Sequence, residues 1–231
     1  NQYVTGISYK HLFKKGIFTL SLSRNFVDYD ATQKDSLLNP VFKNLSREGE
    51  NELKADLVFK PGDFSELNIG ASAKFIKFSA DIKLNSFRTS FGEVLDITSL
   101  TAKNNFAKYG FYTQYSDILF SRIIFSAGVR GDYFDGINDG FRLSPRGSLS
   151  YMFSDRTSVT LSGGLYSQAP SYIWLAAYPQ NRDLKPVKVT QIIAGIEHKL
   201  FDDLLVKTEG FIKDYSDYPS STLRPYLVLA N

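Results

Sequence analysis

Apolar and polar residues alternate along most of this chain with a period of two, in segments of about ten residues. In residues 159–166, valine, leucine and glycine occupy the odd positions, and threonine, serine, glycine and tyrosine occupy the even positions. A period of two is typical of a β-strand with one apolar and one polar face. No window of a dozen residues carries apolar positions at helical spacing. The pattern predicts an all-β chain without helices, with strands at residues 3–9, 17–24, 53–59, 66–74, 105–115 and 123–132, and four more within 144–216.

The predicted strands are joined alternately by short and long connections. A connection as long as residues 25–50 usually carries function or is disordered. Alternating connections predict an antiparallel up-and-down sheet with its long loops at one end, as in a β-barrel. The short connections are 11–16, 61–64, 116–117, 153–157 and 201–203, and the long ones are about 25–50, 76–104, 134–143 and 168–187.

The apolar face of these strands fits a lipid environment. Strands of about 9–11 residues with alternately short and long loops are typical of outer-membrane barrels. Tyrosine and phenylalanine lie near many strand ends, where interfacial girdles form. We therefore predict an antiparallel up-and-down transmembrane β-barrel. A soluble β-sandwich has the same alternation and stays an alternative. No run of about 18 apolar residues occurs, so no transmembrane helix is predicted.

Composition narrows the classes of function. The chain has 27 basic and 24 acidic residues, which is too balanced to indicate a nucleic-acid partner. It has no cysteine, which excludes structural disulfides and thiolate metal sites. Its 14 tyrosines and 19 phenylalanines favour strands, because these side chains suit a pleated, half-buried surface.

Candidate chemistry is sparse. His11 and His198 have no cysteine or carboxylate at metal-ligand spacing. Asp132, Asp135 and Asp139 are clustered, but their spacing is not that of a 12-residue calcium loop. No nucleophile motif or phosphate-binding loop is found. We expect neither enzyme activity nor a metal site nor a cofactor.

Four charged residues on the polar faces of the strands are candidate lumen charges. Three of them, Arg130, Asp132 and Arg146, lie close enough in the predicted sheet to pair across neighbouring strands. Structural ion pairing inside the lumen is one interpretation, and contact with a solute or a plug is the other. The fourth candidate is Glu197.

Several short motifs occur in a fixed order over residues 105–216. They are Gly-Val-Arg-Gly-Asp at 128–132, Ser-Pro-Arg at 144–146, Phe-Ser-Asp at 153–155, Gln-Ala-Pro at 168–170, Asn-Arg-Asp-Leu-Lys-Pro at 181–186 and Gln-Ile-Ile-Ala-Gly-Ile-Glu-His at 191–198. In this order and spacing the chain resembles the barrel of TonB-dependent outer-membrane receptors. Residues 1–104 fit that barrel in layout and carry none of its specific motifs.

The resemblance implies a 22-stranded barrel of the bacterial outer membrane that encloses an N-terminal plug. It also implies that the barrel binds a scarce solute at extracellular loops. The solute enters when a TonB-type energy-transducing complex of the inner membrane pulls on the plug. The implied partners are outer-membrane lipid, the plug of the same polypeptide, the TonB-type complex and, as a further partner, a surface lipoprotein.

The predicted strands make up about half of such a barrel. The sequence contains no plug-like segment and no TonB-box-like start. We therefore expect residues 1–231 to be a partial outer-membrane barrel domain, with the plug and the remaining strands outside this chain. A self-contained ten-stranded barrel is the alternative, and it requires residues 3–9 to pair with residues 204–215.

By the same resemblance, the aromatic-rich loop of residues 166–178 is the best candidate for contact with the solute. Packing of this loop against neighbouring loops is the alternative. Two other functions stay open: a passive porin or adhesion barrel without energy coupling, and a soluble β-sandwich binding module. The candidate ligand-contacting side chains are Tyr166, Tyr172, Trp174 and Tyr178.

Overall fold

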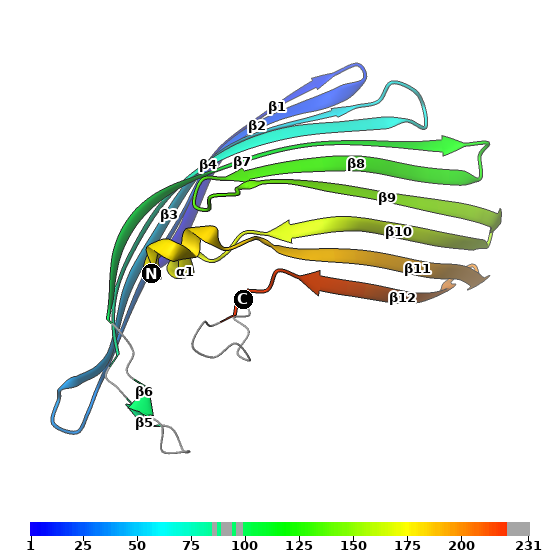
Figure 1. Cartoon of the computed structure of the whole chain (residues 1–231). Coiled ribbons are helices and arrows are strands. Elements are labelled where there is room, and N and C mark those ends of the chain that lie inside the picture. The colour runs from blue at the N-terminus through cyan, green and yellow to red at the C-terminus, as the bar shows by residue number, and fades with distance from the viewer. Residues whose placement is uncertain (85–86, 89–93, 96–98, 221–231) are drawn as a thin grey trace.

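The computed structural model describes residues 1–84, 87–88, 94–95 and 99–220. Ten strands form one antiparallel sheet in the order β1-β2-β3-β4-β7-β8-β9-β10-β11-β12 (Figure 1). A separate pair, β5 (Phe87–Arg88) and β6 (Val94–Leu95), lies in the connection between β4 and β7. The all-β up-and-down prediction is confirmed. The ten strands are β1 Gln2–Phe13, β2 Gly16–Lys34, β3 Pro40–Phe59, β4 Glu66–Leu84, β7 Leu100–Leu119, β8 Ile123–Phe134, β9 Phe141–Ser154, β10 Thr157–Gln168, β11 Val187–Phe201 and β12 Leu204–Ser216.

Short and long connections alternate between the two ends of the sheet from β4 onward, as predicted, but residues 35–39 between β2 and β3 are no longer than residues 60–65 between β3 and β4. The predicted long loops at 25–50 and 76–104 are nevertheless wrong in extent, because β2, β3, β4 and β7 are 19 or 20 residues long. Only residues 35–39 connect β2 to β3. Residues 28–51 of β2 and β3 are largely polar on both faces, so alternation of apolar residues could not reveal a strand there, whereas the extension of β4 still alternates on one face through Ile76, Phe78 and Ile82.

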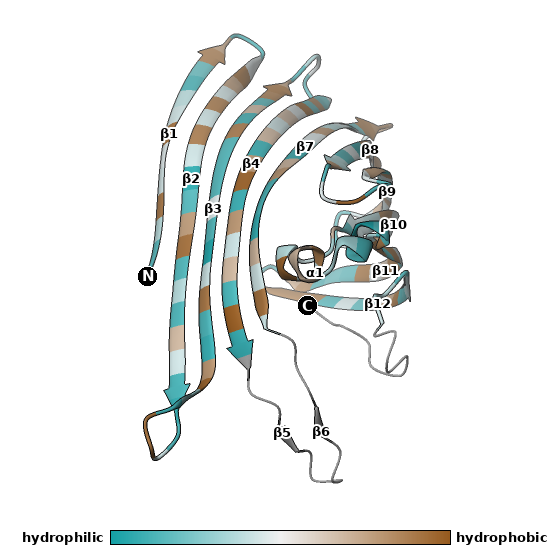
Figure 2. Ribbon diagram, turned by 60° about the vertical axis from the view of Figure 1, so that its left-hand side comes forward, coloured by the Kyte–Doolittle hydropathy of each residue, from teal (hydrophilic) through white to brown (hydrophobic). Residues whose placement is uncertain are grey.

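The long connection between β10 and β11 contains two short helical segments that the sequence analysis did not predict. They are α1 (Tyr172–Ala177) and the 3-10 helix η1 (Pro179–Asp183). Six residues are too few for helical periodicity to be visible. Figure 2 shows α1 on the concave side of the curved sheet. We call that concave side the inner face and the convex side the outer face.

The sheet is open within the residues that the structure describes. There β1 is hydrogen-bonded to β2 alone and β12 to β11 alone, and the two strands lie at opposite edges. The pairing that a self-contained ten-stranded barrel requires is therefore not formed. Both edges present unpaired backbone groups that a further strand can extend, as in the wall of a larger barrel.

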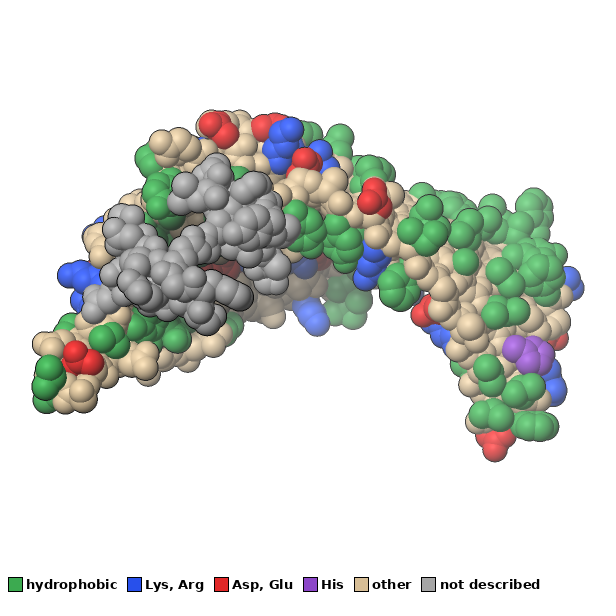
Figure 3. Space-filling model, turned by 60° about the horizontal axis from the view of Figure 1, so that its bottom comes forward, with side chains coloured by type: hydrophobic (Ala, Val, Ile, Leu, Met, Phe, Trp, Pro, Cys, Tyr) green, Lys and Arg blue, Asp and Glu red, His purple; other side chains and the backbone are tan. Residues whose placement is uncertain are grey.

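The register aligns like residues across neighbouring strands. Leu161 is opposite Leu149 of β9, which is opposite Phe125 of β8. Ser162 is opposite Ser148 in the same strand pair. Apolar side chains therefore accumulate on the outer face and small polar ones on the inner face, and the strands in Figure 2 carry alternating hydrophobic and hydrophilic bands. Figure 3 shows many hydrophobic side chains toward the end with the tight turns.

Aromatic side chains form a row across the outer face, toward the end with the long connections. We call the set Tyr3, Phe26, Phe75, Tyr109 and Tyr133 the upper aromatic row. Ring centroids are 5.2 Å apart for Tyr3 and Phe26, and 6.2 Å apart for Tyr109 and Tyr133. A second group lies nearer the tight turns: Tyr9, Tyr115, Phe125, Tyr151 and Phe153.

The apolar outer face, up to and including the upper aromatic row, is nearly as tall as the apolar band of an outer-membrane barrel. On β4 the apolar outer positions run from residue 67 to residue 75, which is about 27 Å along the strand and about 20 Å of depth at a tilt of about 40°. Outer-membrane barrels have an apolar band about 25 Å tall. Among the helices of the described residues, none is long and apolar enough to cross a membrane.

Candidate functional site on the inner face

An apolar cluster fixes α1 to the inner face. Every second residue of β4 from residue 76 to residue 82 is apolar and buried, and these side chains meet apolar ones from β7, β8 and two loops. Burial of such side chains typically contributes about 1.5–3 kcal/mol each. We call this set the inner cluster: Ile76, Phe78, Ala80, Ile82, Phe106, Phe134, Ile137, Tyr172 and Leu175.

Tyr172 is the centre of the inner cluster. Its ring stacks on Phe106 with 5.4 Å between centroids, and it lies 6.1 Å from the ring of Phe134. Its hydroxyl donates a hydrogen bond of 2.9 Å to Oε1 of Glu50. Burial, and then the nearby carboxylate of Glu50, raise the pKa of Tyr172 above its ordinary value. The hydroxyl therefore stays protonated and keeps donating to the carboxylate.

A group of charged side chains adjoins Tyr172. Nζ of Lys74 lies 3.1 Å from Oε2 of Glu50 and 3.9 Å from Oε2 of Glu52. Nζ of Lys108 lies 4.4 Å from the ring centroid of Tyr172, a distance at which a cation is attracted to an aromatic face. The apolar contact between the β10–β11 loop and the inner face therefore borders directly on charged side chains of β3, β4 and β7.

The β8–β9 loop is hydrogen-bonded to the β10–β11 loop. The backbone N–H of Asn138 donates to the carbonyl of Arg182 at 2.8 Å, and its side-chain amide donates to Asp183 at 2.6 Å. Arg182 in turn donates to the carbonyl of Asp135 at 2.9 Å. Oδ1 of Asp135 accepts from the N–H of Ala107 on β7 at 2.8 Å. The two loops are therefore fixed to each other and to the sheet.

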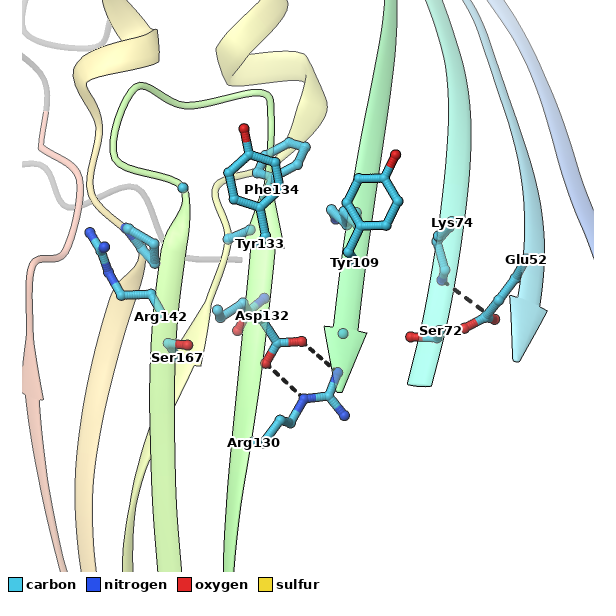
Figure 4. Close-up of a pocket in the computed structure, with 16 residues that line it drawn as sticks. Glu52, Ser72, Lys74, Tyr109, Arg130, Asp132, Tyr133, Phe134, Arg142 and Ser167 are labelled. Carbon is cyan, nitrogen blue, oxygen red and sulfur yellow. Dashed lines mark hydrogen bonds and ion pairs between the residues drawn. The ribbon is translucent and has the colours of Figure 1, made fainter. Parts of the chain in front are cut away.

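A cavity of about 380 Å³ lies on the inner face beside these loops (Figure 4). Arg130 donates two hydrogen bonds of 2.7 Å to the carboxylate of Asp132. This pair lies within β8 rather than across neighbouring strands, because residues two apart share a face of a strand. The charged side chains lining the cavity are Glu52, Lys74, Lys108, Arg130, Asp132 and Arg142.

Comparison with known proteins decides the family. Residues 2–228 match the family model of TonB dependent receptor-like β-barrels. The chain belongs to this family. No curated protein sequence matches it.

Solved structures share the fold of this receptor barrel. The copper transporter OprC is similar with a TM-score of 0.70 at 14% identity, over 94% of this chain and 39% of OprC. A ferric enterobactin receptor (PfeA) mutant from Pseudomonas aeruginosa has a TM-score of 0.72 at 16% identity, over 93% of this chain and 34% of that one. The siderophore receptor PirA from Acinetobacter baumannii has a TM-score of 0.74 at 16% identity, with coverage of 93% and 34%.

These similarities show how much of the receptor barrel this chain represents and where the barrel is located. The chain spans little more than a third of the length of the solved structures, so it corresponds to part of a larger wall. The barrel lies in the bacterial outer membrane, and its family consists of transport receptors. The soluble β-sandwich alternative is wrong, because one curved sheet forms the wall of a receptor barrel.

The four candidate lumen charges all lie on the inner face of the receptor barrel, at different heights. Arg130 and Asp132 line the cavity. Arg146 lines a separate hollow of about 190 Å³, nearer the tight turns. Glu197 lies nearer still to the tight turns, opposite Lys207 of β12. The structure therefore brings only two of these four charged residues together, Arg130 and Asp132.

The four candidate ligand-contacting aromatics are also separated. Tyr166 lies on β10 and lines the same hollow as Arg146, with 42% of its surface exposed. Tyr172 is buried in the inner cluster, and Trp174 is half-buried on α1. Tyr178 is 55% exposed at the start of η1. Of the four, Trp174 and Tyr178 belong to the loop and remain accessible.

Sequence reasoning missed the charged group around Tyr172. Glu50 falls in the predicted loop 25–50, and Lys74 and Lys108 fall in the predicted strands 66–74 and 105–115, where nothing singled them out. A signal was present: acidic residues at 48, 50 and 52 have a period of two, which places three carboxylates on one face of a strand.

The described residues contain no group of three or more histidine, cysteine or carboxylate side chains arranged to hold a metal ion. The three clustered aspartates have separate partners: Asp132 binds Arg130, Asp135 accepts a backbone N–H, and Asp139 binds Arg142. His198 is hydrogen-bonded to Thr157 at 2.8 Å.

The Arg130–Asp132 pair is expected to contribute little to stability. The two side chains are 46% and 37% exposed, and exposed ion pairs typically contribute less than about 1 kcal/mol. Asp132→Asn should therefore lower the free energy of unfolding of the full-length receptor by less than about 1 kcal/mol. Urea unfolding in lipid vesicles measures this, and a loss above about 2 kcal/mol would show that the pair is structurally essential.

Proposed function

We propose that this chain is part of a receptor that binds a scarce solute at its extracellular loops and imports it by energised movement of a plug. The observation that carries the proposal is the family match over residues 2–228. The inner face supports it. Its ion pairs and small polar side chains suit contact with a domain that can move away, whereas a dry apolar core would not. The end with the long connections is extracellular in this reading, and the tight turns face the periplasm.

The plug and the remaining strands are contributed by the rest of the polypeptide in this proposal. Residues 1–231 then form one part of the barrel wall, and the open edges at β1 and β12 pair with the remaining strands. The candidate lumen charges at 130, 132, 146 and 197 contact the plug or the passing solute. Outer-membrane lipid surrounds the wall, the TonB-type complex acts through the plug, and a surface lipoprotein is a further partner.

The solute-binding surface in this proposal is the accessible part of the β10–β11 loop together with the cavity beside it. Trp174 and Tyr178 offer aromatic surface on that loop, and Tyr166 offers it lower on the wall. Tyr172 supports the loop from behind, because its ring is buried against β7 and β8. Solved structures with this fold are named for copper, for ferric enterobactin and for a siderophore, and these are solutes to test first.

Two measurements on the full-length protein test energy coupling without knowledge of the solute. We expect the purified protein to bind the periplasmic domain of a TonB-type protein in surface plasmon resonance. We also expect it to conduct almost no ions in a planar bilayer, because a plug closes the lumen. Stable open channels together with no binding of the TonB domain would instead establish a passive porin or an adhesion barrel.

A further inference from the structure

The inner face of β3 carries a carboxylate that has no partner. Glu48, Glu50 and Glu52 alternate along the strand, so their side chains share this face. Nζ of Lys74 lies 3.1 Å from the carboxylate of Glu50 and 3.9 Å from that of Glu52 (Figure 4). In the described part of the chain, the half-buried side chain of Glu48 forms neither an ion pair nor a hydrogen bond. A half-buried carboxylate without a partner is costly to keep charged.

The nearest neighbours of Glu48 in the sheet are apolar. It lies opposite Val27 of β2 on one side and Phe78 of β4 on the other. Phe78 belongs to the inner cluster, and its ring centroid is 6.2 Å from that of Tyr172 on α1. The residue that follows Glu48 pairs with Phe26 of the upper aromatic row, so Glu48 lies just above that row. The carboxylate therefore borders the contact that holds the β10–β11 loop against the inner face.

This position raises the pKa of the Glu48 carboxyl above its ordinary value. Burial is the main cause, because the charged form loses hydration, and repulsion by the carboxylate of Glu50 is the second. The ammonium groups of Lys108 on β7 and Lys74 on β4 oppose the rise only in part. From α1 the group facing this region is the Tyr172 hydroxyl, which stays protonated and donates to Glu50, and β2 places an uncharged side chain opposite.

We propose that Glu48 is a proton switch that fixes the β10–β11 loop more firmly to the inner face in acid than at neutral pH. With the loop in place, apolar side chains and Glu50 oppose a negative charge on Glu48, and protonation removes that charge. When α1 moves away from Phe78, water reaches the carboxylate and the opposition is relieved. Fixing the loop and binding a proton therefore favour each other. The proposal concerns the loop and the sheet alone and does not rest on solute import.

The direction of the pH dependence follows from the raised pKa. Below the ordinary range of carboxyl pKa values, Glu48 is protonated whether the loop is fixed or released, and the fixed state has its full stability. As the pH rises through the raised pKa, the fixed state acquires an unpaired charge and this stability is lost. The attachment of the loop therefore weakens as the pH rises from acid toward neutral.

Hydrogen exchange of residues 169–186 in the full-length receptor tests the switch between about pH 5 and about pH 8, with protection factors corrected for the intrinsic effect of pH on exchange. In the parent protein, protection is expected to be at least about threefold higher at the acid end. Glu48→Gln should show the high value throughout, because a neutral amide replaces the charge. The matched control, Glu66→Gln, removes a carboxylate from the inner face of β4 near the tight turns and should keep the pH dependence of the parent.

A second variant keeps the carboxylate. Val27→Lys places an ammonium group directly opposite Glu48, so protection should rise at the neutral end and the pH dependence should disappear. The proposal is overturned if protection in the parent is the same at both ends of the pH range, or if it falls toward acid. A pH dependence that persists in Glu48→Gln would overturn it as well, and so would a loss of the dependence in Glu66→Gln.

Discussion

Replacing Tyr172 with alanine is expected to release the β10–β11 loop from the inner face of the barrel. The ring packs on Phe106 and Phe134, and removing a buried aromatic side chain typically costs about 3–5 kcal/mol. The hydroxyl bond to Glu50 is lost as well. Hydrogen exchange in residues 169–186 of the full-length receptor should therefore become at least about a hundredfold faster.

The control for this experiment is Tyr172→Phe, which keeps the ring and removes the hydroxyl. A hydrogen bond to a charged group contributes about 1.5–3 kcal/mol, so an intermediate increase in exchange is expected. If alanine leaves the exchange of residues 169–186 unchanged, the loop is held by its hydrogen bonds to residues 135–138 rather than by the inner cluster. Solute uptake measured on the same variants would show whether a fixed loop is needed for binding.

The arrangement of the sheet followed directly from the sequence because its cause is local. A strand that meets water on one face and lipid on the other must alternate residue by residue. Residues 159–166 alternate in this way, and the structure places their leucines on the outer face. The tight turn at residues 155–156 lies within the predicted connection 153–157 for the same reason.

Although β4 continues to alternate on its inner face through Ile76, Phe78 and Ile82, the extensions of β2 and β3 could not be predicted in this way because both of their faces are largely polar. Their pairing is stabilised by backbone hydrogen bonds and by cross-strand pairs such as Lys43–Asp81. Neither interaction leaves a hydrophobic pattern in the sequence. The residues from 28 to 51 therefore had the composition of a loop and the structure of a strand.

The inner cluster was unpredictable for a different reason. It joins β4, β7, β8 and two loops, and Glu50 and Tyr172 are 122 residues apart in the chain. Sequence analysis selected Tyr172 as part of the aromatic-rich loop of residues 166–178 and predicted contact with the solute. Only the folded arrangement of α1 against β7 and β8 shows that its ring meets Phe106 and Phe134.

Placing an arginine at Leu161 on the outer face is expected to destabilise the receptor strongly. Leu161 is 56% exposed on the outer face of β10, opposite Leu149 and Ala194. In the membrane this exposed surface meets hydrocarbon, and an arginine near the middle of an outer-membrane barrel costs about 2–4 kcal/mol. Urea-dependent folding of the full-length receptor into lipid vesicles measures the loss.

The neighbouring residue provides the control at the same depth. Ser162 lies on the inner face, where it lines the polar hollow that also contains Arg146. Ser162→Arg keeps its guanidinium out of the lipid, so only a weak repulsion from Arg146 opposes it, and we expect a loss of less than about 1 kcal/mol. The difference between two adjacent arginines thus measures which face meets lipid. Equal losses for the two variants would mean that both faces lie in similar surroundings, and the assignment of the outer face to lipid would then be wrong.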